Sequence, residues 1–142
     1  MNKYREMRDR HQKEFDSFPM FFAFNDKQFE EGMKRLGLQA NETDKIYKMG
    51  VSGGFYRRSD AKAFRDLLDR QAKEMEDAIA ADETGDGFAF DMFSYELANH
   101  EYGYTGELAD TLDALGLTLK EIRADAKLTH ALEKAIAAQW DE

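Results

Sequence analysis

The sequence predicts a mostly helical α+β fold with one small β-hairpin, in a single domain that spans residues 1–142. Apolar residues recur at helical spacing along several segments, and a glycine cluster lies between two short apolar pairs. A chain of 142 residues is long enough for one ordinary domain but not for two. A hydrophobic content of 42% is enough to form a buried core, and a single proline argues against a disordered chain. The absence of cysteine excludes a disulfide scaffold and any thiolate metal site.

The N-terminal third alternates between helix and extended chain. Residues 2–18 are predicted as an amphipathic helix, which Pro19 ends because the residue before a proline avoids the helical region. The aromatic run 20–24 is predicted as a buried strand or extended segment. Asn25 is a favourable N-cap, so the next helix is expected over residues 26–36.

The glycine cluster at residues 50–54 predicts the turn of a β-hairpin, because Ile46-Tyr47 and Phe55-Tyr56 flank it. The same residues match the G-x-S-x-G pattern of a nucleophile elbow. That motif needs a strand before it and a helix after it, inside a large α/β sheet. A strand-like pair follows here and the chain is short, so we expect no hydrolase nucleophile at Ser52.

The rest of the chain is predicted to be helical. Four helices are expected, over residues 60–82, 88–101, 107–115 and 119–139. Glycines at 103 and 106 are expected to break the chain between the second and the third. Thr118 and Glu121 form a capping-box pattern before the last helix. The inner face of that helix is predicted to carry Leu128, Leu132, Ile136 and Trp140.

The charges are unevenly distributed along the chain. The net charge is −9, and residues 74–119 hold 12 acidic side chains and no lysine or arginine. Such a stretch repels nucleic acid and attracts a basic groove. Two interpretations stay open, a solvated face and a partner-binding face. For the second, the expected binding residues are Glu74, Asp77, Asp82, Glu83 and Asp86, with Tyr102 and Tyr104 as apolar contacts beside them.

Part of this acidic stretch resembles a calcium loop. Asp82, Thr84 and Asp86 stand at the first, third and fifth positions of an EF-hand pattern, and Gly87 stands at the sixth. The twelfth position requires a bidentate glutamate but holds Phe93. We therefore interpret the segment as a connection between two helices.

The segment 88–97 is apolar almost all round as a helix, which is typical of a central helix. Glu96 and His100 are spaced so that they lie near each other within its apolar arc. His11, on the apolar stripe of the first helix, could join them. Three interpretations stay open: a buried hydrogen bond, a metal site formed by His100, Glu96 and His11, and acid–base catalysis. We expect no cofactor, with a divalent metal at this site as the alternative.

Three phrases of the sequence carry a resemblance to a known family. They are FPMFFAF at residues 18–24, FEEGM at 29–33 and NHEYGYTG at 99–106. In these phrases the chain resembles a family of small bacterial and phage proteins associated with anti-CRISPR inhibitors of type II Cas9 nucleases. The resemblance implies a binding protein that blocks a nuclease and has no chemistry of its own.

These observations together predict an acidic protein that inhibits a nucleic-acid-handling enzyme, with a Cas9-type nuclease as the expected partner. Such a nuclease holds nucleic acid in positively charged channels, which an acidic protein can occupy. We expect no direct contact with nucleic acid and none with a membrane. No signal peptide or membrane-length apolar run is visible, so the cytoplasm of a bacterial host is the expected location. The alternative is a small metal-binding domain or metal-dependent hydrolase built on Glu96 and His100.

Overall fold

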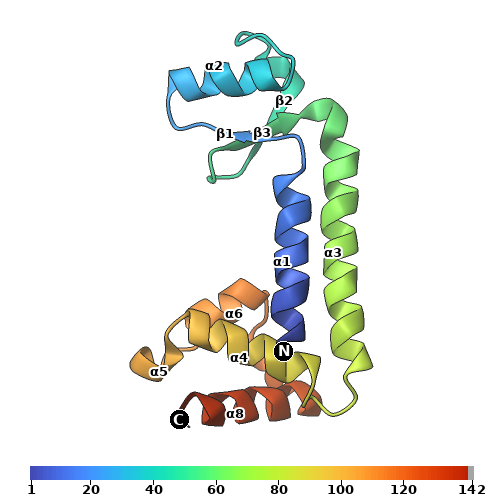
Figure 1. The fold of residues 1–142 in the computed structure, drawn as a ribbon, viewed down its shortest axis with the longest axis vertical. Coiled ribbons are helices and arrows are strands. Elements are labelled where there is room, and N and C mark those ends of the chain that lie inside the picture. The colour runs from blue at the N-terminus through green and yellow to red at the C-terminus, as the bar shows by residue number, and fades with distance from the viewer. Residues whose placement is uncertain (141–142) are drawn as a thin grey trace. The chain divides into compact units, whose positions relative to one another are not determined.

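A computed structural model describes residues 1–140 of the chain (Figure 1). The chain divides into two compact units. The helical unit comprises residues 1–12 and the chain from residue 73 onward, and the sheet unit comprises residues 13–72. The boundaries fall inside helices α1 (Lys3–Asp16) and α3 (Ala61–Ala81). The prediction of a mostly helical α+β fold is confirmed, whereas a single domain over residues 1–142 stays a prediction.

The helical unit is organised around α4 (Phe88–Asn99), which packs against α8 (Ala126–Trp140) along its length (Figure 1). Ala131 and Ala135 of α8 are completely buried, and their small side chains allow the two helices to approach closely. The shorter helices α5 (Tyr102–Thr105) and α6 (Ala109–Leu115) also contact α4, and α7 (Leu119–Arg123) contacts α8. The prediction that the most apolar helix is central is therefore confirmed.

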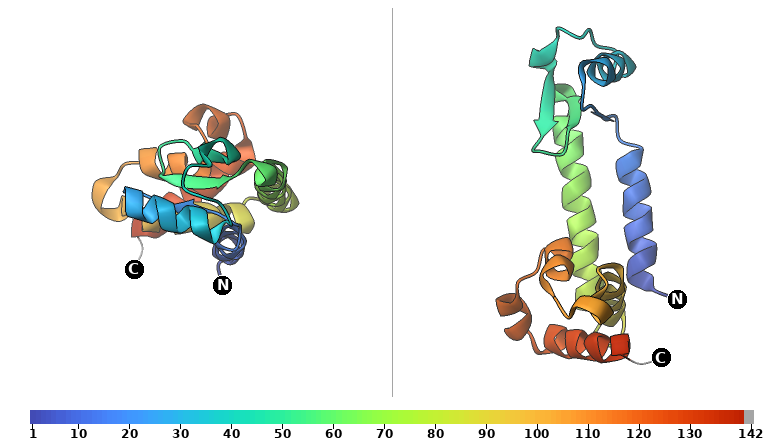
Figure 2. Two further views of the ribbon diagram at one scale, coloured as in Figure 1. Left: turned by 90° about the horizontal axis from the view of Figure 1, so that it is seen from above. Right: turned by 90° about the vertical axis from the view of Figure 1, so that its left-hand side faces the viewer.

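The sheet unit contains three antiparallel strands in the order β1-β3-β2, with α2 (Asp26–Arg35) beside them (Figure 2). The strands are β1 (Phe21–Phe22), β2 (Ile46–Met49) and β3 (Gly54–Arg57), and short 3₁₀ turns occupy Thr43–Lys45 and Arg58–Asp60. The predicted hairpin is confirmed as β2 and β3. Ser52 lies in its turn and donates a hydrogen bond to the Met49 carbonyl at 2.7 Å, and the segment that follows it is strand β3 rather than a helix.

The core of the sheet unit depends on a close approach between helix and strand. Phe21, Met33, Leu36 and Ile46 are buried together. A Cβ added at Gly32 would lie 2.1 Å from the Phe21 ring. Only a glycine on α2 leaves space for this ring.

The aromatic run 20–24 was predicted as a buried strand or extended segment; it contains a strand, but two of its phenylalanines are not buried. Phe21 is buried, but Phe22 is 44% exposed and Phe24 is 76% exposed. The run is extended and contains β1, so successive side chains point to opposite faces and only one face meets the core.

The C-terminal region differs from its prediction in three ways. The expected helix 119–139 is two helices, because the Asp125 carboxylate accepts the N–H groups of Lys127 and Leu128 and starts α8 anew. The expected break at glycines 103 and 106 contains the short helix α5. The residue before this helix, Glu101, has a left-handed backbone conformation with φ of 56°. Trp140, expected on an inner face, is 58% exposed. The capping box of Thr118 and Glu121 is confirmed.

No helix among residues 1–140 combines the length and the apolar character that crossing a membrane requires.

Candidate functional site

The most unusual polar group in the helical unit is the carboxylate of Glu96. This side chain lies on the inner side of α4, and the residue is 2% exposed. The Tyr4 hydroxyl donates a hydrogen bond to its Oε2 at 2.5 Å. Asn99 Nδ2 lies 3.5 Å from Oε1, and Arg8 Nε lies 3.9 Å from Oε2. A buried carboxylate with such partners ties α1 to α4.

Tyr4 is held in place by other aromatic rings. Its ring contacts Phe88 at 6.0 Å and Tyr95 at 5.7 Å between centroids. Burial, and then the hydrogen bond to the Glu96 carboxylate, raise the pKa of Tyr4 well above its ordinary value of 10.0. Tyr4 therefore stays a hydrogen-bond donor at neutral pH, and the pair is suited to holding the fold rather than to moving a proton.

His100 does not share the burial of Glu96. Its side chain is 25% exposed. Nδ1 donates a hydrogen bond to the main-chain carbonyl of Glu96 at 2.8 Å and lies 4.0 Å from the carboxylate Oε1. The two residues interact, as the spacing predicted, but mainly through the backbone, and Tyr4 is the closer partner of the carboxylate. A carbonyl can only accept, so Nδ1 carries the proton in this arrangement.

His11 lies apart from that pair. Its Nε2 lies 2.6 Å from Glu74 Oε2, and Arg10 contacts the same oxygen at 3.1 Å. Among the described residues, His100, Glu96 and His11 do not form a group that could hold one metal ion. The structure thus does not bring the three expected ligands together, and a bound metal stays a prediction.

The carboxylates expected to form the centre of the acidic surface are mostly occupied within the helical unit. Glu74 contacts His11 and Arg10 as described above. Asp77 forms an ion pair with Lys73 at 3.0 Å. Asp86 contacts His130 at 2.8 Å and Lys134 at 3.0 Å, and the hydrogen bond from His130, followed by that from Lys134, lowers its pKa. Glu83 is exposed.

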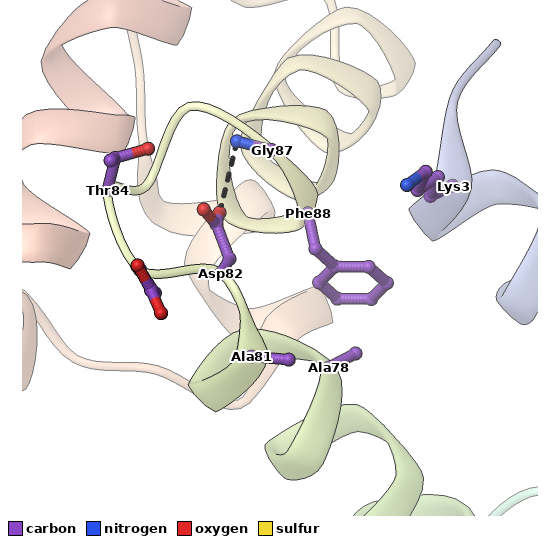
Figure 3. Close-up of a pocket in the computed structure, with 8 residues that line it drawn as sticks. Lys3, Ala78, Ala81, Asp82, Thr84, Gly87 and Phe88 are labelled. Carbon is purple, nitrogen blue, oxygen red and sulfur yellow. Dashed lines mark hydrogen bonds between the residues drawn. The ribbon is translucent and has the colours of Figure 1, made fainter.

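Asp82 stabilises the loop that precedes α4. Its two carboxylate oxygens accept the backbone N–H groups of Gly85 at 3.0 Å, Gly87 at 3.2 Å and Ala89 at 2.9 Å, and Figure 3 shows the bond to Gly87. Burial by itself would raise the pKa of Asp82, but these three donors outweigh it and hold the pKa below its ordinary value. The loop therefore uses this carboxylate to start α4, in agreement with the prediction of a helix connection.

A pocket of about 550 Å³ lies beside this loop (Figure 3). It is lined by Lys3, Ala78, Ala81, Asp82, Glu83, Thr84, Gly87 and Phe88. Its lining contains no nucleophile paired with a base. The Asp82 carboxylate that borders it is already engaged by the loop backbone, so the pocket contains no catalytic arrangement that we recognise.

The structure does not bring Tyr102 and Tyr104 together with the expected acidic centre. They follow the C-terminal end of α4, whereas Asp82 and Asp86 precede its N-terminal end. A helix of 12 residues separates the two groups, which is about 18 Å along its axis. Tyr104 is 93% exposed, and Tyr102 packs edge-on against Trp140 at 5.9 Å.

A second group of carboxylates lies beside these aromatic residues. We define the α5–α6 acidic segment as residues 101–113. Its four carboxylates are exposed, and the described part of the chain contains no ion pair for any of them: Glu101, Glu107, Asp110 and Asp113. Sequence reasoning included these residues in the cation-free stretch but placed its centre at the other end of α4. Spacing alone could have indicated that Asp77 forms an ion pair, because Lys73 precedes it by four residues on the same helix.

Comparisons with known proteins identify a family but no activity. No curated protein and no solved structure matches the chain significantly. Residues 3–138 match the family named DUF7659, which is described as a family of unknown function. This match covers nearly the whole chain, and the chain therefore belongs to the DUF7659 family.

Proposed function

We propose that this chain is a binding protein whose α5–α6 acidic segment docks on a basic surface of a nucleic-acid-handling enzyme and thereby inhibits it. The protein makes no contact with nucleic acid and performs no chemistry itself. Its proposed place of action is the cytoplasm of a bacterial host.

One observation carries the proposal, namely that the exposed carboxylates of the α5–α6 acidic segment form no ion pair within the part of the chain that the structure describes. The helical unit holds nine basic and 19 acidic side chains. Among the acidic residues before α4, Glu74, Asp77 and Asp86 form ion pairs, whereas Glu107, Asp110 and Asp113 form none within the described residues. Unmatched charges of one sign create a field that attracts and orients a basic partner.

Exposed aromatic side chains support an interface at the same place. Tyr104 is 93% exposed and Trp140 is 58% exposed, and both residue types are enriched where proteins bind each other. Tyr102 joins α5 to α8 through its contact with Trp140. The carboxylates would then guide association, and the aromatic rings would slow dissociation.

A Cas9-type nuclease is the first partner to test, because the resemblance of residues 18–24, 29–33 and 99–106 implies it. Such nucleases hold a heteroduplex in a positively charged channel. An acidic protein in that channel would exclude nucleic acid without cutting or binding it.

The test compares two charge-reversed variants that carry the same net charge. The first replaces Glu107→Lys, Asp110→Lys and Asp113→Lys, and the control replaces the exposed residues Glu76→Lys, Glu83→Lys and Glu133→Lys. Binding to an immobilised Cas9–guide complex is measured by biolayer interferometry at two salt concentrations. We expect the first variant to associate at least about tenfold more slowly at low salt, and the control to change by less than about twofold.

Three results would contradict the proposal in different ways. Equal loss in both variants would show that only net charge matters and would remove the α5–α6 acidic segment from the interface. Tight binding of the wild type that resists added salt would show that charge does not drive association. No binding of the wild type would exclude Cas9 as the partner.

A further inference from the structure

The sheet unit has a groove of different character from the acidic surface. Its volume is about 440 Å³. It is lined by Tyr47, Lys48, Tyr56, Ala61, Phe64, Arg65 and Leu68. Tyr47 and Lys48 are neighbours on β2 and therefore point to opposite faces of the sheet, so a groove that both line runs along the edge of β2. Helix α3 provides the other wall through Ala61, Phe64, Arg65 and Leu68.

That edge of the sheet has no neighbouring strand among residues 1–140. The strand order β1-β3-β2 gives β2 one neighbour, β3, with Tyr47 opposite Tyr56. In an antiparallel ladder, alternate residues of an edge strand direct their N–H and C=O groups outward. Arg58 Nε donates to the Ile46 carbonyl at 3.2 Å, which uses one acceptor at the start of the strand. The remainder of β2 can pair with an added strand.

The floor of the groove is aromatic. The rings of Tyr47 and Tyr56 lie 5.8 Å apart, and those of Tyr56 and Phe64 lie 4.7 Å apart. Tyr47 and Leu68 are each 41% exposed. An apolar side chain from a partner would find a surface here that the sheet unit itself does not cover.

The groove is positively charged, which favours an anionic partner. Lys48 and Arg65 line it, and the lining contains no aspartate or glutamate. The structure of residues 1–140 describes no ion pair for either cation. Arg58 adds a third positive charge over the Tyr47 ring, at 4.6 Å from its centroid. Anionic side chains on both sides of an apolar one would complement this pattern.

We propose that this groove binds an acidic peptide segment of a partner protein, which adds in extended form as a strand beside β2. Strand addition next to a helix uses main-chain hydrogen bonds for affinity and pockets for alternate side chains for specificity. In this arrangement an aromatic or aliphatic side chain lies on Tyr47, Phe64 and Leu68, and flanking carboxylates contact Lys48 and Arg65. The inference concerns a surface separate from the α5–α6 acidic segment and does not depend on it.

A single-stranded nucleic acid is the other anionic polymer that aromatic and basic residues can bind. The observations favour a peptide. One face of the Tyr47 ring is already covered by Arg58, which reduces the area for base stacking. The chain as a whole carries a net charge of −9, which repels a strand with one negative charge per nucleotide more than a short peptide with a few carboxylates.

The experiment selects peptides from a phage-displayed random dodecapeptide library on the immobilised full chain. Enriched peptides are synthesised with a fluorescein label, and their affinities are measured by fluorescence polarisation. The same measurements use the variant Lys48→Glu with Arg65→Glu, and a control of equal charge, Lys27→Glu with Lys34→Glu, on α2 of the same unit. Circular dichroism melting checks that each variant folds. Fluorescein-labelled oligo(dT) is titrated in parallel.

We expect enriched peptides with one aromatic or aliphatic residue between acidic residues. Their affinity should fall at least about tenfold in the groove variant and less than about twofold in the control. Methylation of alternate backbone nitrogens of the peptide should also weaken binding, because it removes strand pairing. Enrichment of peptides without acidic residues, equal affinity for both variants, no enrichment at all, or full affinity of the methylated peptide would each overturn the proposal. Tight oligo(dT) binding that only the groove variant loses would replace the peptide with a nucleic acid.

Discussion

The bond between Tyr4 and Glu96 gives the sharpest test of how the helical unit is held together. Tyr4→Phe removes one hydroxyl from a residue that is 3% exposed and keeps the ring in place. The Glu96 carboxylate then loses a donor at 2.5 Å, while Asn99 at 3.5 Å, Arg8 at 3.9 Å and His100 at 4.0 Å all lie farther away. A buried charged acceptor that loses its main donor costs about 2–3 kcal/mol in the free energy of unfolding.

The assay is urea denaturation at pH 7, followed by far-ultraviolet circular dichroism and by the fluorescence of Trp140. This residue is the only tryptophan of the chain and lies in the same unit. Tyr104→Phe is the matched control, because its side chain is exposed, and it should change the free energy of unfolding by less than about 0.5 kcal/mol. If Tyr4→Phe changes it no more than this control does, the hydrogen bond does not stabilise the fold.

A second substitution separates the hydrogen bond from the packing of the ring. Glu96→Met replaces the carboxylate with an apolar side chain of similar length. Replacing both partners of a buried pair with apolar groups is often close to neutral. We therefore expect Glu96→Met to cost less in the Tyr4→Phe background than in the wild type. Strict additivity of the two changes would refute a direct coupling.

Because the pKa of Tyr4 is raised in the folded state, the free energy of unfolding should decrease as the pH rises above the ordinary pKa of tyrosine. Burial, followed by the hydrogen bond to Glu96, makes the folded state hold the Tyr4 proton more tightly than the unfolded state does. Above pH 10 the unfolded state loses this proton first, so the stability that Tyr4 contributes is complete below that pH and is lost as the pH rises. The difference in stability between wild type and Tyr4→Phe should shrink by up to about 1.4 kcal/mol per pH unit above pH 10. A difference that stays constant from pH 9 to pH 11 would contradict this reasoning.

Two further substitutions test the sheet unit and the loop before α4. Gly32→Ala should lower the melting temperature strongly, because its Cβ would lie 2.1 Å from the Phe21 ring, whereas Gly103→Ala, with 3.9 Å to its nearest atom, should be tolerated. Similar melting of the two variants would show that α2 moves away from β1 easily. Asp82→Asn should cost about 1–2 kcal/mol at neutral pH, because it weakens the acceptor of three backbone N–H groups. Since the pKa of Asp82 is lowered in the folded state, this cost should vanish as the pH falls through about 4 and below, and a cost independent of pH would contradict the assignment.

Local sequence patterns determined most of the secondary structure. The hairpin at residues 46–57 follows from glycines between apolar pairs, and the capping box at Thr118 follows from two residues three positions apart. The central place of α4 follows from its apolar composition, because a helix without a polar face must be covered by others. Such features depend on neighbours in the sequence, so a single sequence is enough to predict them.

The sequence also indicated that Glu96 is a buried polar group, but only the tertiary structure decided its partner. Spacing on one helix pointed to His100, whereas the carboxylate bonds to Tyr4, which is 92 positions away. No local pattern contains this pair, because it forms only when α1 packs on α4.

The acidic stretch shows the same limit of sequence reasoning. Composition determined that residues 74–119 lack cations, but charges are matched in space rather than along the chain. Asp86 is matched by Lys134, which is 48 positions away, while Asp110 and Asp113 stay exposed without a matched cation among the described residues. The order of residues therefore determined how much negative charge the chain carries. Long-range packing decided where that charge remains available to a partner, because only folding brings the distant cations next to some carboxylates and leaves others in water.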